Sequence, residues 1–223
     1  MENTVPDAAR LESMPLAVDR YELGPIGTNC YVVRTERGAP AAAVFDPGAD
    51  AAQLRLEIAR MGVTIAGIVV THTHYDHIGA VADLAEATGA PVYVSEVEAP
   101  VLANPDAYYA GMRIRPWADV TTLTGDDSLS LAGIDFQIAE VPGHSPGHLA
   151  FYADGALFSG DVLFAGSVGR TDLPMADWAT LVESIRGLVD RFPPETIVYS
   201  GHGPETTLGA ELARNPFLTE LRA

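Results

Sequence analysis

Four of six consecutive residues carry side chains of the kinds that bind transition metals, in the stretch His72-Thr73-His74-Tyr75-Asp76-His77. Imidazole and carboxylate donors without a thiolate suit Zn²⁺, and they also leave Fe and Mn open. In an extended chain His72 and His74 project to the same side, because side chains alternate with period two. Where the chain then turns into a helix, Asp76 and His77 swing to a neighbouring direction. The spacing predicts two adjacent clusters, each still short of ligands.

Three further candidate ligands follow later apolar runs and stand among glycines: His144, Asp161 and His202. Glycine lets the backbone approach a site closely. A histidine alone at the end of a strand is more often a hydrogen-bonded structural residue than a ligand. Seven such groups in this pattern are different, because burying them without a cation would carry a heavy desolvation cost. We therefore expect all seven to bind metal.

Hydrophobic patterning predicts the elements that position these residues. Apolar and β-branched runs predict strands at residues 17–23, 30–34, 42–46, 65–70, 92–94, 129–131, 135–140, 149–153, 156–159 and 196–200. Helical spacing predicts helices at 51–61, 78–88, 178–189 and 208–215, with Asp177 as a plausible N-cap of the third. Each half is β-rich first and then runs through helix and strand. Two sheets packed face to face with helices outside would bury these elements, and we expect an α/β fold in one domain over residues 1–223.

The segment from residue 96 to 124 follows no clear periodicity and contains three prolines. We expect a short helix and an irregular connection there, which could cover a site. Its aromatic residues Tyr108, Tyr109 and Trp117 either line a pocket or serve ordinary packing.

Composition excludes several classes of function. The 223 residues carry a net charge of −17, which disfavours binding to nucleic acid. All basic residues are arginine, so lysine chemistry is absent, and an anionic substrate group must be held by arginine, backbone N–H or metal. The single cysteine, Cys30, reads as a small core residue and allows no disulfide within the chain. No run is apolar enough for a membrane span, and the first 16 residues lack the pattern of a secretion signal, so a cytoplasmic location is expected.

The His-x-His-x-Asp-His motif, followed by His, Asp and His in this order, resembles the metallo-β-lactamase superfamily over about residues 24–218. Asp46-Pro47-Gly48 is similar to the first motif of that superfamily. The stretch 160–172 resembles the hydroxyacylglutathione hydrolase (glyoxalase II) branch, and Asn215-Pro216-Phe217-Leu218 resembles its short single-domain members. The resemblance implies a four-layer αββα sandwich of two similar halves, with the metal site at one edge of the sheets.

The resemblance also implies how the ligands divide between two zinc ions. One ion takes His72, His74 and His144, the other takes Asp76, His77 and His202, and Asp161 bridges them. Asp76 and Asp161 would be the catalytic carboxylates. The implied activity is hydrolysis of a small thioester such as S-lactoylglutathione, by water whose pKa two metals lower toward about 7.

For each of three residues near the implied site, two interpretations are open. Asp46 either accepts a hydrogen bond from a ligand imidazole or is only a turn residue. His148 either supports a ligand or is structural. Arg170 either binds a substrate carboxylate or pairs with Asp172, since arginine suits both tasks.

The chain departs from full-length glyoxalase II. Only 21 residues follow His202, so we expect no separate C-terminal helical domain that binds glutathione. The acyl and thiol portions of the substrate, the metal loaded in the cell and the oligomeric state therefore stay open.

The competing enzyme is a persulfide dioxygenase with one Fe(II) held by His72, His144 and Asp161. A β-lactamase is disfavoured because lactamases of the implied fold lack a carboxylate at the position that matches Asp161. A non-catalytic redox or binding module is also disfavoured, because the sequence shows no flavin or rubredoxin partner domain of the kind that such a module would need.

Overall fold

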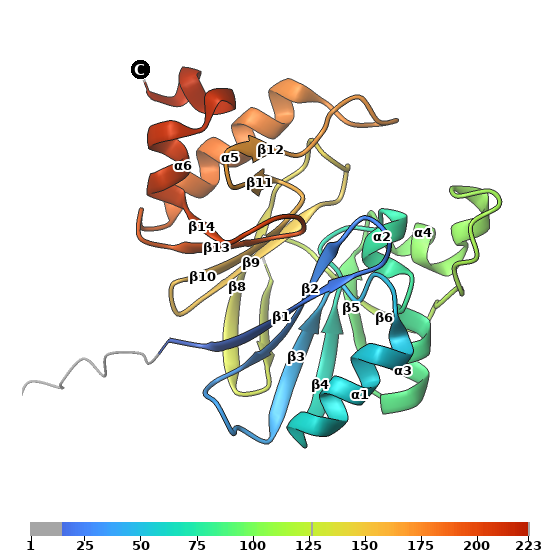
Figure 1. The fold of residues 1–223 in the computed structure, drawn as a ribbon. Helices are drawn as coiled ribbons and strands as arrows, with labels where there is room; N and C mark the ends of the chain where they lie inside the picture. The colour runs from blue at the N-terminus through green and yellow to red at the C-terminus, as the bar shows by residue number, and fades with distance from the viewer. Residues whose placement is uncertain (1–14, 126, 223) are drawn as a thin grey trace, which may run out of the picture.

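Two six-stranded sheets organise the computed structural model, which describes residues 15–125 and 127–222 (Figure 1). The first sheet follows chain order, with strands β1 (Ala17–Leu23), β2 (Thr28–Arg34), β3 (Ala41–Phe45), β4 (Thr64–Val69), β5 (Val92–Ser95) and β6 (Val120–Leu123). Strands β1 to β3 are antiparallel, and β3 to β6 are parallel. Parallel neighbours need crossover connections, and helices α1 (Ala51–Met61) and α3 (Val81–Thr88) supply two of them.

The second sheet has the order β14-β13-β10-β9-β8-β7. Its strands are β7 (Ser128–Leu131), β8 (Ile134–Glu140), β9 (Leu149–Ala153), β10 (Ala156–Gly160), β13 (Ile197–Ser200) and β14 (Thr206–Thr207). Only β10 and β13 pair in parallel, joined through helix α5 (Trp178–Arg191). A small hairpin of β11 (Leu163–Phe164) and β12 (Ser167–Val168), helix α6 (Leu208–Arg214) and the 3₁₀ segment η2 (Pro216–Arg222) complete this half.

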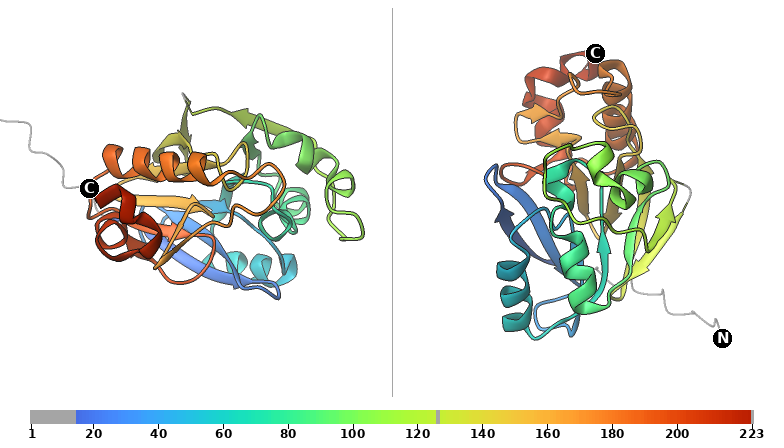
Figure 2. Two further views of the ribbon diagram at one scale, coloured as in Figure 1. Left: turned by 90° about the horizontal axis from the view of Figure 1, so that it is seen from above. Right: turned by 90° about the vertical axis from the view of Figure 1, so that its right-hand side faces the viewer.

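Three apolar layers hold the two sheets and their helices together. Between the sheets, the ring of Phe45 stacks on that of Phe158 at 4.4 Å. Leu54 of α1 and Leu84 of α3 bury against the outer face of the first sheet, and Leu181 of α5 belongs to the cluster on the outer face of the second. Figures 1 and 2 show α1 and α3 on one side of the sheets and α5 and α6 on the other. The expected αββα fold class is confirmed.

The expected helix at 78–88 is wrong in one respect, because the structure has two helices there. Helix α2 (Tyr75–Ile78) ends at Gly79, and α3 begins at Val81. The loop after β3 crosses at this break, where the amide of Ala80 donates to the carbonyl of Pro47 at 2.9 Å. A Cβ atom on Gly48 would lie 1.5 Å from the carbonyl oxygen of Asp76. Tertiary contact therefore decides where the helix is interrupted.

The segment 96–124 contains the expected short helix, α4 (Ala99–Ala103), and a 3₁₀ turn, η1 (Pro105–Ala107). It also contains β6, an edge strand that the patterning missed because two of its four residues are exposed. Cys30 is fully buried in β2, as expected. Among the helices of the described residues, none is both long and apolar enough to cross a lipid bilayer.

Candidate metal centre

The predicted ligands follow the ends of strands that meet at one edge of the sandwich. His72 and His74 come directly after β4, Asp161 after β10, and His202 after β13. The carboxyl ends of parallel neighbours lie at the same edge of a sheet, and β10 and β13 are such a pair. A hydrogen bond joins the first sheet to this edge: the amide of Asn29 in β2 donates to the carbonyl of Gly201, after β13, at 2.7 Å.

Two groups of side chains come close enough to share an ion each. Within a group, all potential ligand atoms lie within 4.8 Å of one another; the groups are His72, His74 and His144, and Asp76, His77 and His202. A third group of the same compactness joins members of both: His72, His77 and Asp161. The structure thus brings together all seven residues expected from the sequence, in the grouping that the resemblance implied.

Asp161 lies between the two groups. Its Oδ1 atom is 3.3 Å from His77 Nε2, and its Oδ2 atom is 3.4 Å from His202 Nε2 and 3.6 Å from His144 Nε2. Each carboxylate oxygen therefore faces at least one imidazole nitrogen, which is the position a bridging ligand requires.

The donor atoms fit divalent cations. His77 Nε2, His144 Nε2 and Asp161 Oδ1 are buried without a hydrogen-bond partner, although buried polar atoms are nearly always paired. Ligands at about 2.0–2.2 Å from a tetrahedral ion lie roughly 3.3–3.6 Å from one another. The spacings of 3.3 to 3.6 Å around Asp161 match that range.

Protonation is strongly perturbed at this site. Burial lowers the pKa of His72 well below its usual value. Hydrogen bonds to Asp161 and Asp76 raise the pKa of His202 to about 9. Burial alone would raise the pKa of Asp161, but His77 and His202 hold it well below its usual range. Without a cation, protons on imidazoles balance the buried carboxylates, and a bound cation would take over that positive charge.

Asp46 combines the two roles left open for it. Its Oδ2 atom lies 3.0 Å from His77 Nδ1, and its oxygens also accept from the amide and hydroxyl of Thr71 at 2.8 and 2.7 Å. Its backbone has the positive φ of 48° typical of a tight turn. The turn thus directs a carboxylate at the Nδ1 atom of His77, which would fix the orientation of this candidate ligand.

His148 is fully buried and supports Asp161 through the backbone. Its Nε2 atom accepts from the amide of Asp161 at 3.1 Å, and its Nδ1 atom lies 3.2 Å from the carbonyl of Leu149. Burial lowers the pKa of His148 well below its usual value, which fits a neutral ring that accepts at Nε2.

Glu98 was missed by sequence reasoning. Its buried carboxylate accepts from the amide and hydroxyl of Thr73, from the hydroxyl of Ser145 at 2.7 Å and from the amide of Gly147 at 3.1 Å. Thr73 separates two candidate ligands and Ser145 follows a third, so Glu98 joins the loops that carry all three histidines of one group. Its place just after β5 could have identified it, since the other site residues also follow strands.

Two hydroxyl groups hold the second group and the neighbouring loop. The hydroxyl of Thr28 donates to Asp76 Oδ2 at 2.7 Å. The hydroxyl of Tyr109 donates to the carbonyl of Thr73 at 2.9 Å. One of the aromatic residues of segment 96–124 thereby contacts the metal-ligand loop directly.

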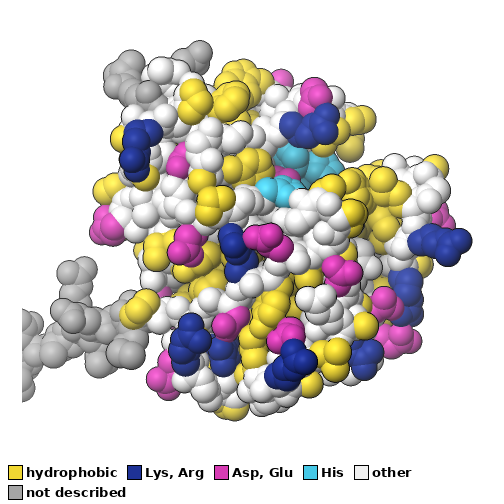
Figure 3. All heavy atoms as spheres, viewed as in Figure 1, with side chains coloured by type: hydrophobic (Ala, Val, Ile, Leu, Met, Phe, Trp, Pro, Cys, Tyr) yellow, Lys and Arg dark blue, Asp and Glu magenta, His cyan; other side chains and the backbone are white. Residues whose placement is uncertain are grey.

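A pocket of about 700 Å³ opens above the ligands, and both Tyr108 and Tyr109 line it. Figure 3 shows histidine side chains within a hollow flanked by hydrophobic side chains. Arg170 also lines this pocket, and its Nε and Nη2 atoms donate to the two carboxylate oxygens of Asp172 at 2.7 and 2.8 Å. Of the two roles left open for Arg170, pairing with Asp172 is the one present in the structure.

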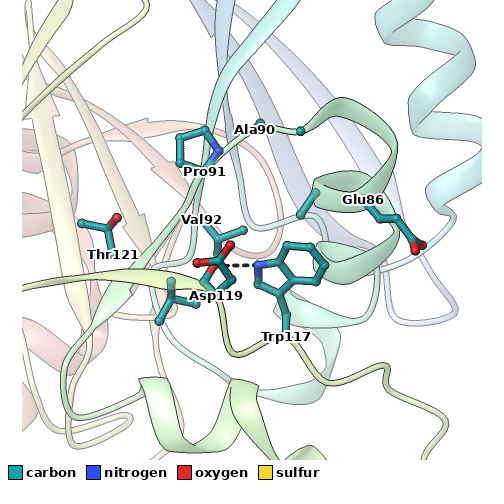
Figure 4. A pocket seen from close by; sticks show the side chains of 10 residues that line it. Glu86, Ala90, Pro91, Val92, Trp117, Asp119 and Thr121 are labelled. Atoms are coloured by element: carbon teal, nitrogen blue, oxygen red, sulfur yellow. Dashed lines mark hydrogen bonds between the residues drawn. The ribbon is translucent and has the colours of Figure 1, made fainter.

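A second pocket, of about 410 Å³, lies beside α3 and β6 (Figure 4). Trp117 lines it and donates through Nε1 to the carbonyl of Asp119 at 2.8 Å. Its lining includes no histidine. Trp117 therefore serves packing away from the candidate metal centre.

Comparison with known proteins agrees with this geometry. The hydroxyacylglutathione hydrolase GloC of Haemophilus influenzae is 33% identical over 192 residues, covering 79% of this chain and 87% of that protein. The solved structure of BLEG-1, described as a B3 metallo-β-lactamase, is 40% identical with a TM-score of 0.85, covering 91% of this chain and all of that one. TTHA1623, solved in a di-iron-bound form, is 41% identical with a TM-score of 0.81, covering 90% of this chain and all of that one.

The sequence model for the metallo-β-lactamase superfamily matches residues 23–202, which include every candidate ligand. The same span contains every strand of the two sheets except β14 and all but the last residue of β1. Motif, fold and site geometry thus lead to one conclusion: the chain belongs to the metallo-β-lactamase superfamily.

Proposed function

We propose that this chain is a hydrolase that uses two divalent cations, zinc in the first instance, to cleave a small thioester. One observation carries the proposal: two compact ligand groups adjoin a shared carboxylate, with buried donor atoms left unpartnered, at the floor of an open pocket. The similarity to a hydroxyacylglutathione hydrolase supports the thioester class.

His72, His74 and His144 would hold one cation, Asp76, His77 and His202 the other, and Asp161 both. Such a pair of cations supplies Lewis acidity and lowers the pKa of water toward about 7. All donors are nitrogen or oxygen, which suits zinc and leaves iron open. The di-iron-bound structure of TTHA1623, which is 41% identical to this chain, supports room for two ions.

The carboxylate of Asp76 is the chain's own group placed to orient the attacking water and to take its proton. Thr28 fixes one of its oxygens, and the Asp76 side chain is only partly buried beside the pocket. In the reaction a C–O bond forms from water and the C–S bond breaks. The products are a carboxylate and a thiol, with one proton delivered to sulfur and one released.

Metal content and turnover of the purified protein test the proposal. We expect two zinc ions per chain and hydrolysis of S-lactoylglutathione without oxygen uptake. The variant Asp161→Asn should lose metal and nearly all turnover, whereas Asp190→Asn on the outer helix α5 should change neither. Full turnover by metal-free Asp161→Asn protein would refute the mechanism. One iron per chain with oxygen consumption would instead favour the dioxygenase.

A β-lactam is the second candidate substrate, because BLEG-1 is described as a B3 metallo-β-lactamase and is 40% identical to this chain. The same preparation should be assayed with a β-lactam. A kcat/KM for the β-lactam above that for thioesters would replace the thioester proposal and keep the metal centre.

A further inference from the structure

Exposed hydrophobic side chains of this protein gather around the mouth of the metal pocket. Among the described residues ten large hydrophobic side chains are exposed, and six of them line this one pocket: Ile26, Tyr75, Val97, Tyr108, Met112 and Met175. We call these six the apolar rim. They come from five separate segments of the chain, so no single amphipathic element explains their position. Apolar groups left in water at a pocket mouth indicate a binding surface.

Charged recognition is weak at the same mouth. Among the described residues, Arg170 is the one basic side chain besides histidines that lines the pocket, and two hydrogen bonds already pair its guanidinium with Asp172. The lining carboxylates offer no recognition of their own at the mouth, because Asp76 and Asp161 are candidate cation ligands and Glu98 is buried. An acidic group would therefore have to displace Asp172 to be bound, whereas an apolar group meets no such competition.

Met175 belongs to the apolar rim although its backbone conformation favours glycine. The amide of Ala176 donates to the carbonyl of Leu173 at 3.1 Å, which closes a turn with Pro174 and Met175 at its centre. Met175 has φ of 64°, the left-handed conformation that favours glycine at this turn position. Its side chain is 70% exposed, so packing does not explain a methionine there. The position holds an apolar side chain over the pocket where glycine would suit the backbone better.

From these observations we infer that the apolar rim selects substrates bearing an apolar substituent next to the scissile carbonyl, on the acyl group or on sulfur, over acidic ones. This inference rests on the proposed thioester hydrolysis and specifies its substrate class. Each methylene moved from water to the rim raises affinity by up to about fourfold, so a few methylenes suffice for strong selection.

The experiment uses metal-loaded protein and matched thioesters of N-acetylcysteamine, three of them neutral (acetyl, butyryl and hexanoyl) and one acidic (succinyl). A second series lengthens the alkyl chain on sulfur under a constant acetyl group. We expect kcat/KM to rise about two- to fourfold per methylene in at least one series, and butyryl to exceed succinyl. In Met175→Gly and Met112→Ser this slope should flatten, and in the control Leu56→Ser, an exposed leucine of α1 outside the pocket, it should stay.

Met175→Gly should not unfold the protein, because glycine relieves the positive φ. Its midpoint of thermal unfolding should equal or exceed that of the wild type, so a lost slope cannot be ascribed to instability. Free butyrate, hexanoate and octanoate, tested by thermal shift on loaded protein, provide a binding readout that needs no turnover; their stabilisation should grow with chain length and shrink in Met175→Gly.

The outcomes separate this inference from the proposed function. Hydrolysis with equal kcat/KM across both series, or a preference for succinyl that Arg170→Ala abolishes, would overturn the apolar rim and leave the hydrolase standing. No hydrolysis of any thioester, with chain-length-dependent stabilisation by the free acids, would remove the hydrolase and keep the apolar preference. Loss of a dimer in Met175→Gly without any change in slope would show that the rim binds a second copy of the chain, and would refute the inference.

Discussion

The ligands of the candidate metal centre are oriented by residues that are not ligands. Asp46 contacts the ring of His77, and His148 holds the backbone of Asp161. Glu98 contacts more of the site than either, because its one buried carboxylate accepts hydrogen bonds from two loops that carry candidate ligands. All the groups that donate hydrogen bonds to Glu98 are neutral. The carboxylate therefore holds the two loops in place, but it loses solvation without gaining an ion pair. Such supporting contacts often decide metal affinity as strongly as the ligands do.

Replacing Glu98 by glutamine tests this support. The amide group of glutamine would direct N–H donors at the hydroxyls and amides that now donate to Glu98. We expect the affinity of the site for zinc to fall about 10- to 100-fold with the fold retained, measured by competition with a chromophoric chelator. Glu96→Gln, an exposed neighbour, is the matched control. Equal affinity in the two variants would contradict the role of Glu98.

At the scale of elements, the site depends on strand ends that approach one another without intervening side chains. The turn after β13 brings Gly201 so close to the ligands that a Cβ atom there would lie 2.0 Å from Asp161 Oδ1 and 2.7 Å from His77 Cε1. Helix α5 contains a glycine in the opposite situation, because a Cβ atom on Gly187 would meet nothing within 4 Å. One glycine is required by the site, and the other only weakens a helix.

Alanine at these two positions should have opposite effects. Gly201→Ala should displace Asp161 or His77 and sharply reduce metal content, which elemental analysis would show. Gly187→Ala should stabilise the protein by about 0.5–1 kcal/mol, because alanine is the better residue in a helix interior, and should leave metal content unchanged. Normal metal content in Gly201→Ala would mean that the turn after β13 does not position the ligands.

For the molecule as a whole, the candidate metal centre lies where the two halves of the sandwich meet. His72, His74, Asp76 and His77 follow a strand of the first sheet, and the other three candidate ligands follow strands of the second. Polar contacts between the sheets reinforce the same edge, since the hydroxyl of Tyr31 donates to the carbonyl of Ser200 at 2.7 Å. Ions bound there would stabilise the folded chain over the unfolded one.

Chelation should therefore lower the stability of the entire molecule. A ligand present at 1,000 times its Kd stabilises a fold by about 4 kcal/mol, so complete removal of metal should lower the unfolding midpoint by several degrees in calorimetry. Added zinc should restore it. An unchanged midpoint in protein shown to be free of metal would mean that the two halves do not depend on the site.

Local sequence was enough to predict most of the fold and the ligand types. Buried apolar runs such as that of β4 specify strands within a residue or two, since burial on both faces leaves a continuous pattern. The edge strand β6 was not predicted because it is half exposed. The break between α2 and α3 was not predicted because a distant loop causes it. The ligands stood out because imidazoles and carboxylates at such short spacing have few other uses.

Residue type and local spacing were thus enough to predict the layered fold and the family, and to single out the candidate ligands. The surroundings of those candidate ligands became visible in the folded molecule. The buried role of Glu98 and the gathering of the apolar rim join segments far apart in the chain. Contacts of that kind leave no periodic trace, because they arise when independent strand ends meet at one edge of the sandwich.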